Sequence, residues 1–131
     1  MMDEFELTEI FNISPELLYI AWLDEDQHSE MTGGAAEISD EIGAEFAAWD
    51  GYITGKNLEL KFGKKILQSW RTSEFPQEAE DSLLEIIFER DKDGTKLTLK
   101  HSNLQPGDGE KYKSGWIEHY FNPMKDYFEE M

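Results

Sequence analysis

Cysteine is absent from the 131 residues, and its absence excludes several kinds of chemistry. Disulfides, thiolate nucleophiles and cysteine-based zinc sites all require a thiol. The three histidines, His28, His101 and His119, lack the i, i+3 or i+4 spacing that places two metal ligands on one helix face. The sequence therefore predicts no bound metal and no cofactor.

Positive charge is also scarce, with 12 basic residues against 29 acidic ones and a net charge of −17. Nucleic-acid binding draws most of its affinity from Lys and Arg that neutralise phosphates. A nucleic-acid partner is therefore not expected, and an anionic membrane surface would repel the chain. The negative charge favours basic partners, or small ligands whose binding does not depend on the electrostatic field of the protein. The alternative is that it only maintains solubility.

Long apolar runs are missing as well. No stretch approaches the roughly 20 residues that a membrane helix requires. The first residues, MMDEFELTEIFNI, lack the basic start and apolar run of a secretory signal. We therefore expect a cytoplasmic protein that does not insert into a membrane.

Signatures of catalysis are equally hard to find. Gly33-Gly34 and Gly107-Asp108-Gly109 lack the lysine or the helix register of a phosphate-binding loop. Carboxylate pairs such as Glu129-Glu130 are numerous only because acids are numerous, and none sits on an apolar background that would raise its pKa. No residue is assigned a catalytic role, so the sequence favours a non-catalytic protein without excluding an enzyme.

Apolar residues, in contrast, are plentiful enough for one core. They make up 39% of the chain and include 4 Trp, 5 Tyr and 8 Phe. The length suits one domain, and no internal repeat or break in composition marks a boundary. We expect a single domain over residues 1–131.

The spacing of apolar residues along the chain predicts the order of the helices and strands. Residues 5–13 read as a strand, Ser14 and Pro15 begin a helix, and a second short helix over residues 26–31 stops at Gly33. A period of two then predicts antiparallel strands separated by turn-formers such as Asp50-Gly51. These strands cover residues 35–38, 45–49, 52–62, 65–72, 82–90 and 95–103.

The last segment returns to a helical period. Tyr112, Trp116 and Tyr120 are spaced by four residues, and a second apolar series runs from Phe121 to Phe128. Pro123 lacks a backbone N–H, so we expect it to bend or break this helix. The predicted fold is α+β: a curved antiparallel sheet of six to seven strands, two short helices after the first strand, and a long C-terminal helix across the sheet.

Four stretches carry a resemblance to a known family. In order along the chain they are Asn12-Ile13-Ser14-Pro15, residues 43–55 (GAEFAAWDGYITG), residues 68–76 (QSWRTSEFP) and residues 115–125 (GWIEHYFNPMK). Together they resemble the activators of heat-shock protein 90 ATPase, within the START-like (SRPBCC) helix-grip superfamily.

The resemblance implies two kinds of partner. The wider superfamily is best known for holding hydrophobic ligands between its sheet and its C-terminal helix. Eukaryotic members of the group itself typically carry an additional N-terminal domain, which engages the middle segment of the chaperone and is not part of the matching stretches.

Candidate cavity-lining residues are the apolar faces of the predicted sheet and terminal helix. Their residue types fit either a ligand pocket or a filled core, and His101 fits either an acid or base in a pocket or a hydrogen-bonded residue near a strand end. The candidates are Trp70, Leu84, Ile86, Phe88, Leu97, Leu99, His101, Trp116, Tyr120 and Met124.

Three functions remain open at this point. The first is a non-catalytic domain that binds a hydrophobic small molecule between the sheet and the C-terminal helix. The second is a co-chaperone-like interaction domain for heat-shock protein 90, and the third is a small enzyme of the cyclase or hydrolase kind. A large cavity would favour the first, an exposed apolar patch amid acids the second, and a polar cluster around His101 the third. The sequence does not predict an oligomeric state.

Overall fold

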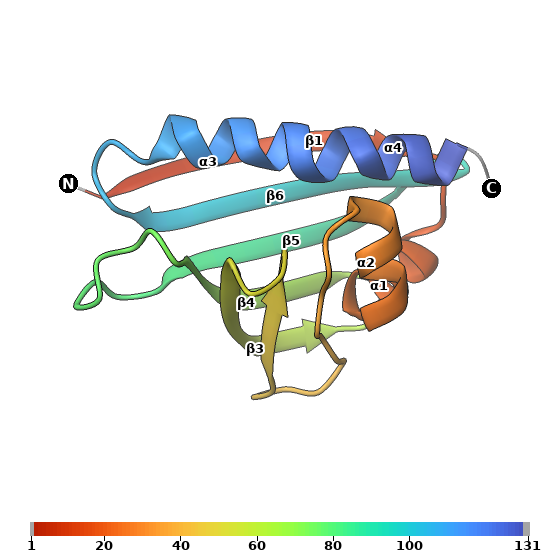
Figure 1. Cartoon of the computed structure of the whole chain (residues 1–131). Helices are drawn as coiled ribbons and strands as arrows, with labels where there is room; N and C mark the ends of the chain where they lie inside the picture. Colours follow the sequence, from red (N-terminus) through yellow and green to blue (C-terminus); the bar gives the residue numbers. More distant parts are fainter. Residues whose placement is uncertain (1, 130–131) are drawn as a thin grey trace.

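A computed structural model describes residues 2–129, and its core element is a six-stranded antiparallel sheet (Figure 1). The strand order is β1-β6-β5-β4-β3-β2. The strands are β1 (Asp3–Phe11), β2 (Glu45–Ala48), β3 (Ile53–Lys61), β4 (Lys65–Thr72), β5 (Ser82–Asp91) and β6 (Gly94–Leu104). The helices are α1 (Pro15–Leu23), α2 (Glu25–Thr32), α3 (Gly109–Trp116), the π-helical η1 (Ile117–Phe121) and α4 (Asn122–Glu129).

The helices cover one face of this sheet. Figure 1 shows α3, η1 and α4 forming one long rod that runs along β6 and β1, with α1 and α2 near its far end. This arrangement confirms the predicted α+β helix-grip fold. None of the helices in residues 2–129 combines the length and the apolarity that crossing a membrane needs.

The two-residue period of β5 and β6 produces the main apolar layer. Leu84 faces His101 across the ladder and Ile86 faces Leu99, and all four side chains are fully buried. Their neighbours Glu85 and Lys100 pair on the opposite face, outside the buried layer. The predicted alternation is thus confirmed in these strands.

The first helix begins as the sequence predicts. The Ser14 hydroxyl accepts a hydrogen bond from the backbone N–H of Leu17 at 3.3 Å, and Pro15 occupies the first turn. Because a proline at this position loses no helical hydrogen bond, the start of α1 is well defined. Trp22 from this helix stacks against both Trp116 and Tyr120, at ring-centroid distances of 6.1 and 5.2 Å.

The strand predicted for residues 35–38 does not form. Glu37 makes a single antiparallel bridge to Ala47, through two backbone hydrogen bonds of 2.8 Å. The partner strand β2 has only four residues and ends directly at a turn, so it offers too short an edge for a longer ladder. The sheet therefore has six strands in the described part of the chain.

Pro123, where the sequence predicts a bend or a break, does not break the helix, because α4 continues through that residue. A π turn, Ile117–Phe121, comes just before it, and Asn122 donates its backbone N–H to the carbonyl of Ile117, five residues earlier. A π turn inserts one extra residue into a helix. It therefore accounts both for the tolerated proline and for the change of apolar register after Tyr120.

Candidate functional site

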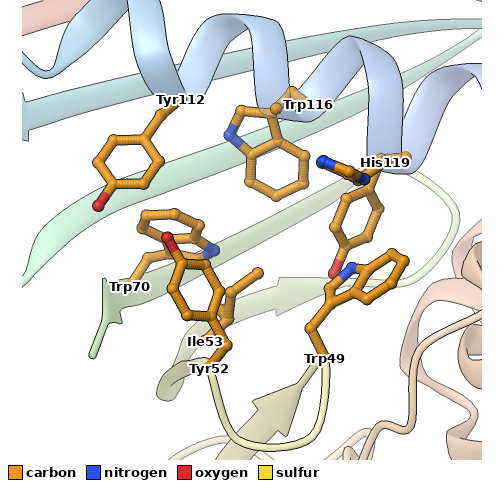
Figure 2. A pocket seen from close by; sticks show the side chains of 9 residues that line it. Trp49, Tyr52, Ile53, Trp70, Tyr112, Trp116 and His119 are labelled. Atoms are coloured by element: carbon orange, nitrogen blue, oxygen red, sulfur yellow. The ribbon is translucent and has the colours of Figure 1, made fainter. Parts of the chain in front are cut away.

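An aromatic pocket lies between the C-terminal helix and the turn that joins β2 to β3 (Figure 2). Its volume is about 290 Å³. Its walls come from the β2–β3 turn, β3, β4, α3 and η1. The lining residues are Trp49, Tyr52, Ile53, Trp70, Tyr112, Gly115, Trp116, His119 and Tyr120.

Helical spacing sets the upper wall of the pocket. Tyr112, Trp116 and Tyr120 recur every four residues, and this spacing keeps successive side chains on one helix face. Trp70 reaches the same space from β4, with its ring 5.2 Å from that of Tyr112 and 5.8 Å from that of Trp116. Figure 2 shows Tyr52 below them, so aromatic rings surround the pocket from helix, strand and turn.

Trp49 closes one side from an unusual backbone conformation. It has φ 52°, and the next two residues, Asp50 and Gly51, also have positive φ, at 58° and 90°. The positive φ of Gly51 confirms the tight turn expected at Asp50-Gly51. A bulky residue at positive φ is uncommon and marks a turn or local strain. The indole packs directly on Gly34, where an added Cβ would lie 2.4 Å from the ring.

Gly115 leaves part of the pocket open. It lies inside α3, where a glycine is less favourable than an alanine by about 1 kcal/mol. A Cβ added to Gly115 would have no neighbouring atom within 4 Å, so open space lies in front of it. No positive φ or close backbone contact requires a glycine here, and Gly115 lies in the lining of the pocket.

Most polar groups at the rim of the pocket already have partners. The hydroxyls of Tyr112 and Thr72 are hydrogen-bonded at 2.8 Å, and the Tyr52 hydroxyl donates to Glu74. Burial, followed by the hydrogen bond to Glu74, raises the pKa of Tyr52. The indole N–H of Trp49 is buried next to the Tyr120 hydroxyl, although it does not reach ordinary hydrogen-bond geometry with any described residue. The interior of the pocket is therefore apolar.

His101 lies behind the pocket, and both of its ring nitrogens form hydrogen bonds within the core. The Trp116 indole N–H donates to its Nδ1 at 3.0 Å, so this nitrogen carries no proton. Its Nε2–H then donates to the Ser82 hydroxyl at 2.8 Å, which itself donates to the carbonyl of Trp70. Burial lowers the pKa of His101 to about 3. The imidazole is thus a neutral, fully bonded part of the core, consistent with the structural interpretation of this residue.

His28 has a similar role at the other end of the aromatic stack. Its Nδ1–H donates to the carbonyl of Trp22 at 2.7 Å, so its Nε2 accepts from the Tyr120 hydroxyl at 3.0 Å. Burial lowers the pKa of His28 and raises that of Tyr120. Within residues 2–129 no three His, Asp or Glu side chains group closely enough to hold a metal ion.

The sequence candidates divide into two groups. Trp70, Trp116 and Tyr120 line the pocket. The other seven are buried in the core away from it, and these are Leu84, Ile86, Phe88, Leu97, Leu99, His101 and Met124.

Sequence reasoning missed the lining residues Trp49, Tyr52, Ile53, Tyr112, Gly115 and His119. The two aromatics on either side of Asp50-Gly51 were the available signal, because turn positions seldom carry large rings without a reason.

Comparison with known proteins places these features in a family. The model of the family described as "Activator of Hsp90 ATPase homolog 1-like protein" matches residues 12–129. Activator of 90 kDa heat shock protein ATPase homolog 1 of Mus musculus is 29% identical over 123 residues, which cover 93% of this chain and 36% of the mouse protein. The chain thus spans about a third of the length of such curated relatives.

Solved structures support the same fold. The crystal structure of an HSP90 activator from Plasmodium falciparum has a TM-score of 0.86 at 26% identity, and covers 95% of this chain and 94% of that one. The solution structure of the Aha1 dimer from Colwellia psychrerythraea has a TM-score of 0.81 at 16% identity, and covers 97% and 96%. At that identity the second likeness concerns the fold alone.

Proposed function

We propose, from the premise that the chain belongs to the family of Activator of Hsp90 ATPase homolog 1-like proteins, that it is a non-catalytic domain that binds an apolar small molecule. The ligand occupies the aromatic pocket between the β2–β3 turn, β4 and the C-terminal helix. The observation that carries this proposal is Gly115, which keeps the pocket open at a cost to its own helix.

The size and the walls of the pocket define the class of ligand. A volume of about 290 Å³ lies at the lower end of the range of about 300–1,000 Å³ that small-molecule sites occupy. Rings of Trp and Tyr favour flat apolar partners, since offset and edge-to-face contacts are available from several directions. A flat bicyclic molecule suits this space.

The hydrogen bonds of the nearby titratable groups support binding rather than catalysis. His101 uses both ring nitrogens within the core, and its low pKa keeps it neutral. The hydroxyls of Tyr52 and Tyr112 are engaged with Glu74 and Thr72. A general acid or base must be free to exchange a proton with its substrate.

Filling the pocket tests this proposal. The change Gly115→Leu places a side chain into the open space, so binding of the apolar dye N-phenyl-1-naphthylamine should fall at least tenfold. The free energy of unfolding should stay equal or rise by up to about 1 kcal/mol, because a helix interior favours leucine over glycine. Fluorescence titration and urea unfolding measure the two effects.

Ser114→Leu is the matched control, since Ser114 is exposed on the same helical turn and does not line the pocket. This variant should bind the dye like the unmodified protein. Equal dye binding by both variants and the unmodified protein would show that the dye does not enter the pocket, and would contradict the proposal. Native mass spectrometry of the purified chain would identify a co-purifying ligand directly.

A protein-interaction function is the second candidate. The mouse relative is named as an activator of a heat-shock protein ATPase, and a chaperone partner of this kind would require an exposed contact surface. Such a surface is present on α1 and the β3–β4 turn, where Ile20 and Phe62 are exposed beside acidic residues. We propose a co-chaperone-like role for heat-shock protein 90 as the alternative, with this surface as its support.

A further inference from the structure

A second hollow lies away from the aromatic pocket, between α1, the loop before β2 and the β3–β4 turn. Its volume is about 420 Å³. We call it the acidic groove, and its lining residues are Tyr19, Ile20, Leu23, Asp24, Glu25, Ile38, Ser39, Asp40 and Phe62. It shares no lining residue with the aromatic pocket.

Two apolar side chains at this groove are exposed. Phe62 is 62% exposed and Ile20 is 40% exposed. Phe62 sits at the tip of a hairpin, where glycine and short polar residues are the usual occupants. Its ring contacts Tyr19 edge-on at 5.3 Å, and Tyr19 in turn contacts Phe88 in the core. Phe62 is therefore an exposed aromatic ring that the core holds in place.

The rim of the groove is acidic. Asp24, Glu25 and Asp40 line it, and none of the three makes an ion pair with any residue the structure describes. No lysine or arginine of residues 2–129 belongs to the lining. Lys61 flanks Phe62 but is engaged with Glu59 at 3.6 Å. The groove thus combines an apolar floor with uncompensated negative charge.

We infer that the acidic groove is a docking site for a basic amphipathic segment of a protein partner. Its apolar residues would cover Phe62 and Ile20, and its Lys or Arg side chains would pair with Asp24, Glu25 and Asp40. The inference rests on the second candidate function and adds the chemistry of the partner. Apolar anchors inside a ring of opposite charge give both affinity and orientation to a protein contact.

The negative charge of the groove favours a basic segment over a second copy of the chain or a membrane surface. A second copy of the chain docked groove to groove would bring two sets of three carboxylates together, and like charges in an interface are unfavourable. An anionic membrane surface meets the same repulsion from a chain of net charge −17. A basic segment gains from the same field, since complementary charge also speeds its encounter with the groove.

A labelled peptide tests the inference on the full chain. The probe is a fluorescein-tagged amphipathic peptide of lysine and leucine, titrated by fluorescence anisotropy and mapped by NMR amide shifts. We expect saturable binding, with shifts concentrated at Ile20, Leu23, Ile38, Asp40 and Phe62. Shifts spread over the acidic surface, or the absence of saturable binding, would overturn the inference.

Two variants separate the apolar from the charged contribution. Phe62→Ser should weaken the peptide about tenfold through lost apolar burial. Neutralising the rim should also weaken it about tenfold and flatten its salt dependence. The rim variant is Asp24→Asn, Glu25→Gln and Asp40→Asn. Its Asp24→Asn change retains a side-chain oxygen to cap α2, because asparagine caps helices as well as aspartate does.

Charge-matched changes elsewhere provide the control. Glu78→Gln, Glu80→Gln and Glu110→Gln remove the same three charges from exposed positions outside the groove. An equal loss of affinity in this control would mean that only net charge matters, and would overturn the site. A dimer that Phe62→Ser dissociates in sedimentation experiments would overturn it in favour of a second copy.

The groove and the proposed functions can fail separately. Binding of purified heat-shock protein 90 that is unaffected by Phe62→Ser would keep the co-chaperone role and overturn the groove. Peptide binding at the groove without chaperone binding would support the groove and reject that role. Dye binding in the aromatic pocket should be unchanged by Phe62→Ser, because the two hollows share no lining residue.

Discussion

Two neutral histidines are buried beside the stack of Trp22, Trp116 and Tyr120. His101 accepts from Trp116, and His28 accepts from Tyr120. Each histidine is thus a hydrogen-bond acceptor for an aromatic residue that lines the pocket. Protonation would turn that acceptor into a donor and leave the Trp116 N–H or the Tyr120 O–H without a partner. The walls of the pocket therefore depend on the neutral state of both rings.

This arrangement predicts a loss of stability in mild acid. The pKa of both histidines is lower in the folded chain than the ordinary value of 6.5, so below about pH 6.5 the unfolded chain binds more protons. The free energy of unfolding must then decrease as the pH is lowered. His101 contributes a loss of about 1.4 kcal/mol per pH unit down to pH about 3, and His28 contributes a loss in the same direction. Urea unfolding at pH 7.5 and 5.5 measures the loss.

Single replacements assign this effect to its residues. His101→Gln should remove a large part of the difference between pH 7.5 and 5.5, and His28→Gln should also reduce it. A pH dependence that is identical in both variants and the unmodified protein would show that neither buried histidine is responsible.

The terminal rod illustrates how the elements fit the sheet. Three consecutive exposed residues, Ile117, Glu118 and His119, occupy the π turn. The spacing of the apolar residues shifts between α3 and α4. The extra residue in the π turn compensates for this shift, so the apolar faces of both helices point toward the sheet. Pro123 follows at a position where its missing N–H interrupts no regular α-helical series.

Removing one residue from the π turn tests its link to the proline. Deletion of Glu118 would convert the segment to a regular helix and place the proline in its interior, which should cost about 3 kcal/mol or more. Pro123→Ala alone should change stability little. Combining the deletion with Pro123→Ala should recover much of the loss, as a double-mutant cycle in urea unfolding would show. Strictly additive effects would mean that the π turn does not serve the proline.

The sequence predicted those elements whose signals are local. Ser14 and Pro15 mark the start of α1, and Asp50-Gly51 marks a hairpin, because helix capping and the turn preference of Asp-Gly are encoded in a few adjacent residues. The segment 35–38 has the residues of a strand, but its length depends on the four-residue β2 that it would have to pair with. The effect of Pro123 depended on the neighbouring π turn, which no local pattern announces.

The pocket was harder to predict than the fold. Inward-facing residues of β5 and β6 were candidates either for lining a pocket or for filling the core, and in the structure they are buried and do not line the aromatic pocket. The lining of that pocket includes Trp49 and Tyr52 from a turn and Gly115 from a helix. A periodic pattern identifies a buried face, but it does not tell which part of that face remains unfilled.

At the scale of the molecule, negative charge dominates the surface. Even if all 12 basic residues were paired, 17 of the 29 carboxylates would remain without a partner. The ion pairs that form, such as Arg90–Glu16 at 2.7 Å, are largely exposed and contribute little. Repulsion among the remaining carboxylates opposes the compact state, so the whole fold carries a cost that salt can relieve.

Salt should therefore stabilise this chain. Raising NaCl from 10 to 150 mM shortens the screening length from about 30 to about 8 Å, and the thermal midpoint should rise by several degrees. Neutralising six exposed carboxylates changes the net charge from −17 to −11 and should reduce that rise. The six changes are the rim variant and its charge-matched control combined. A midpoint that falls with salt would instead mean that the surface ion pairs outweigh the repulsion, because screening weakens attraction and repulsion alike.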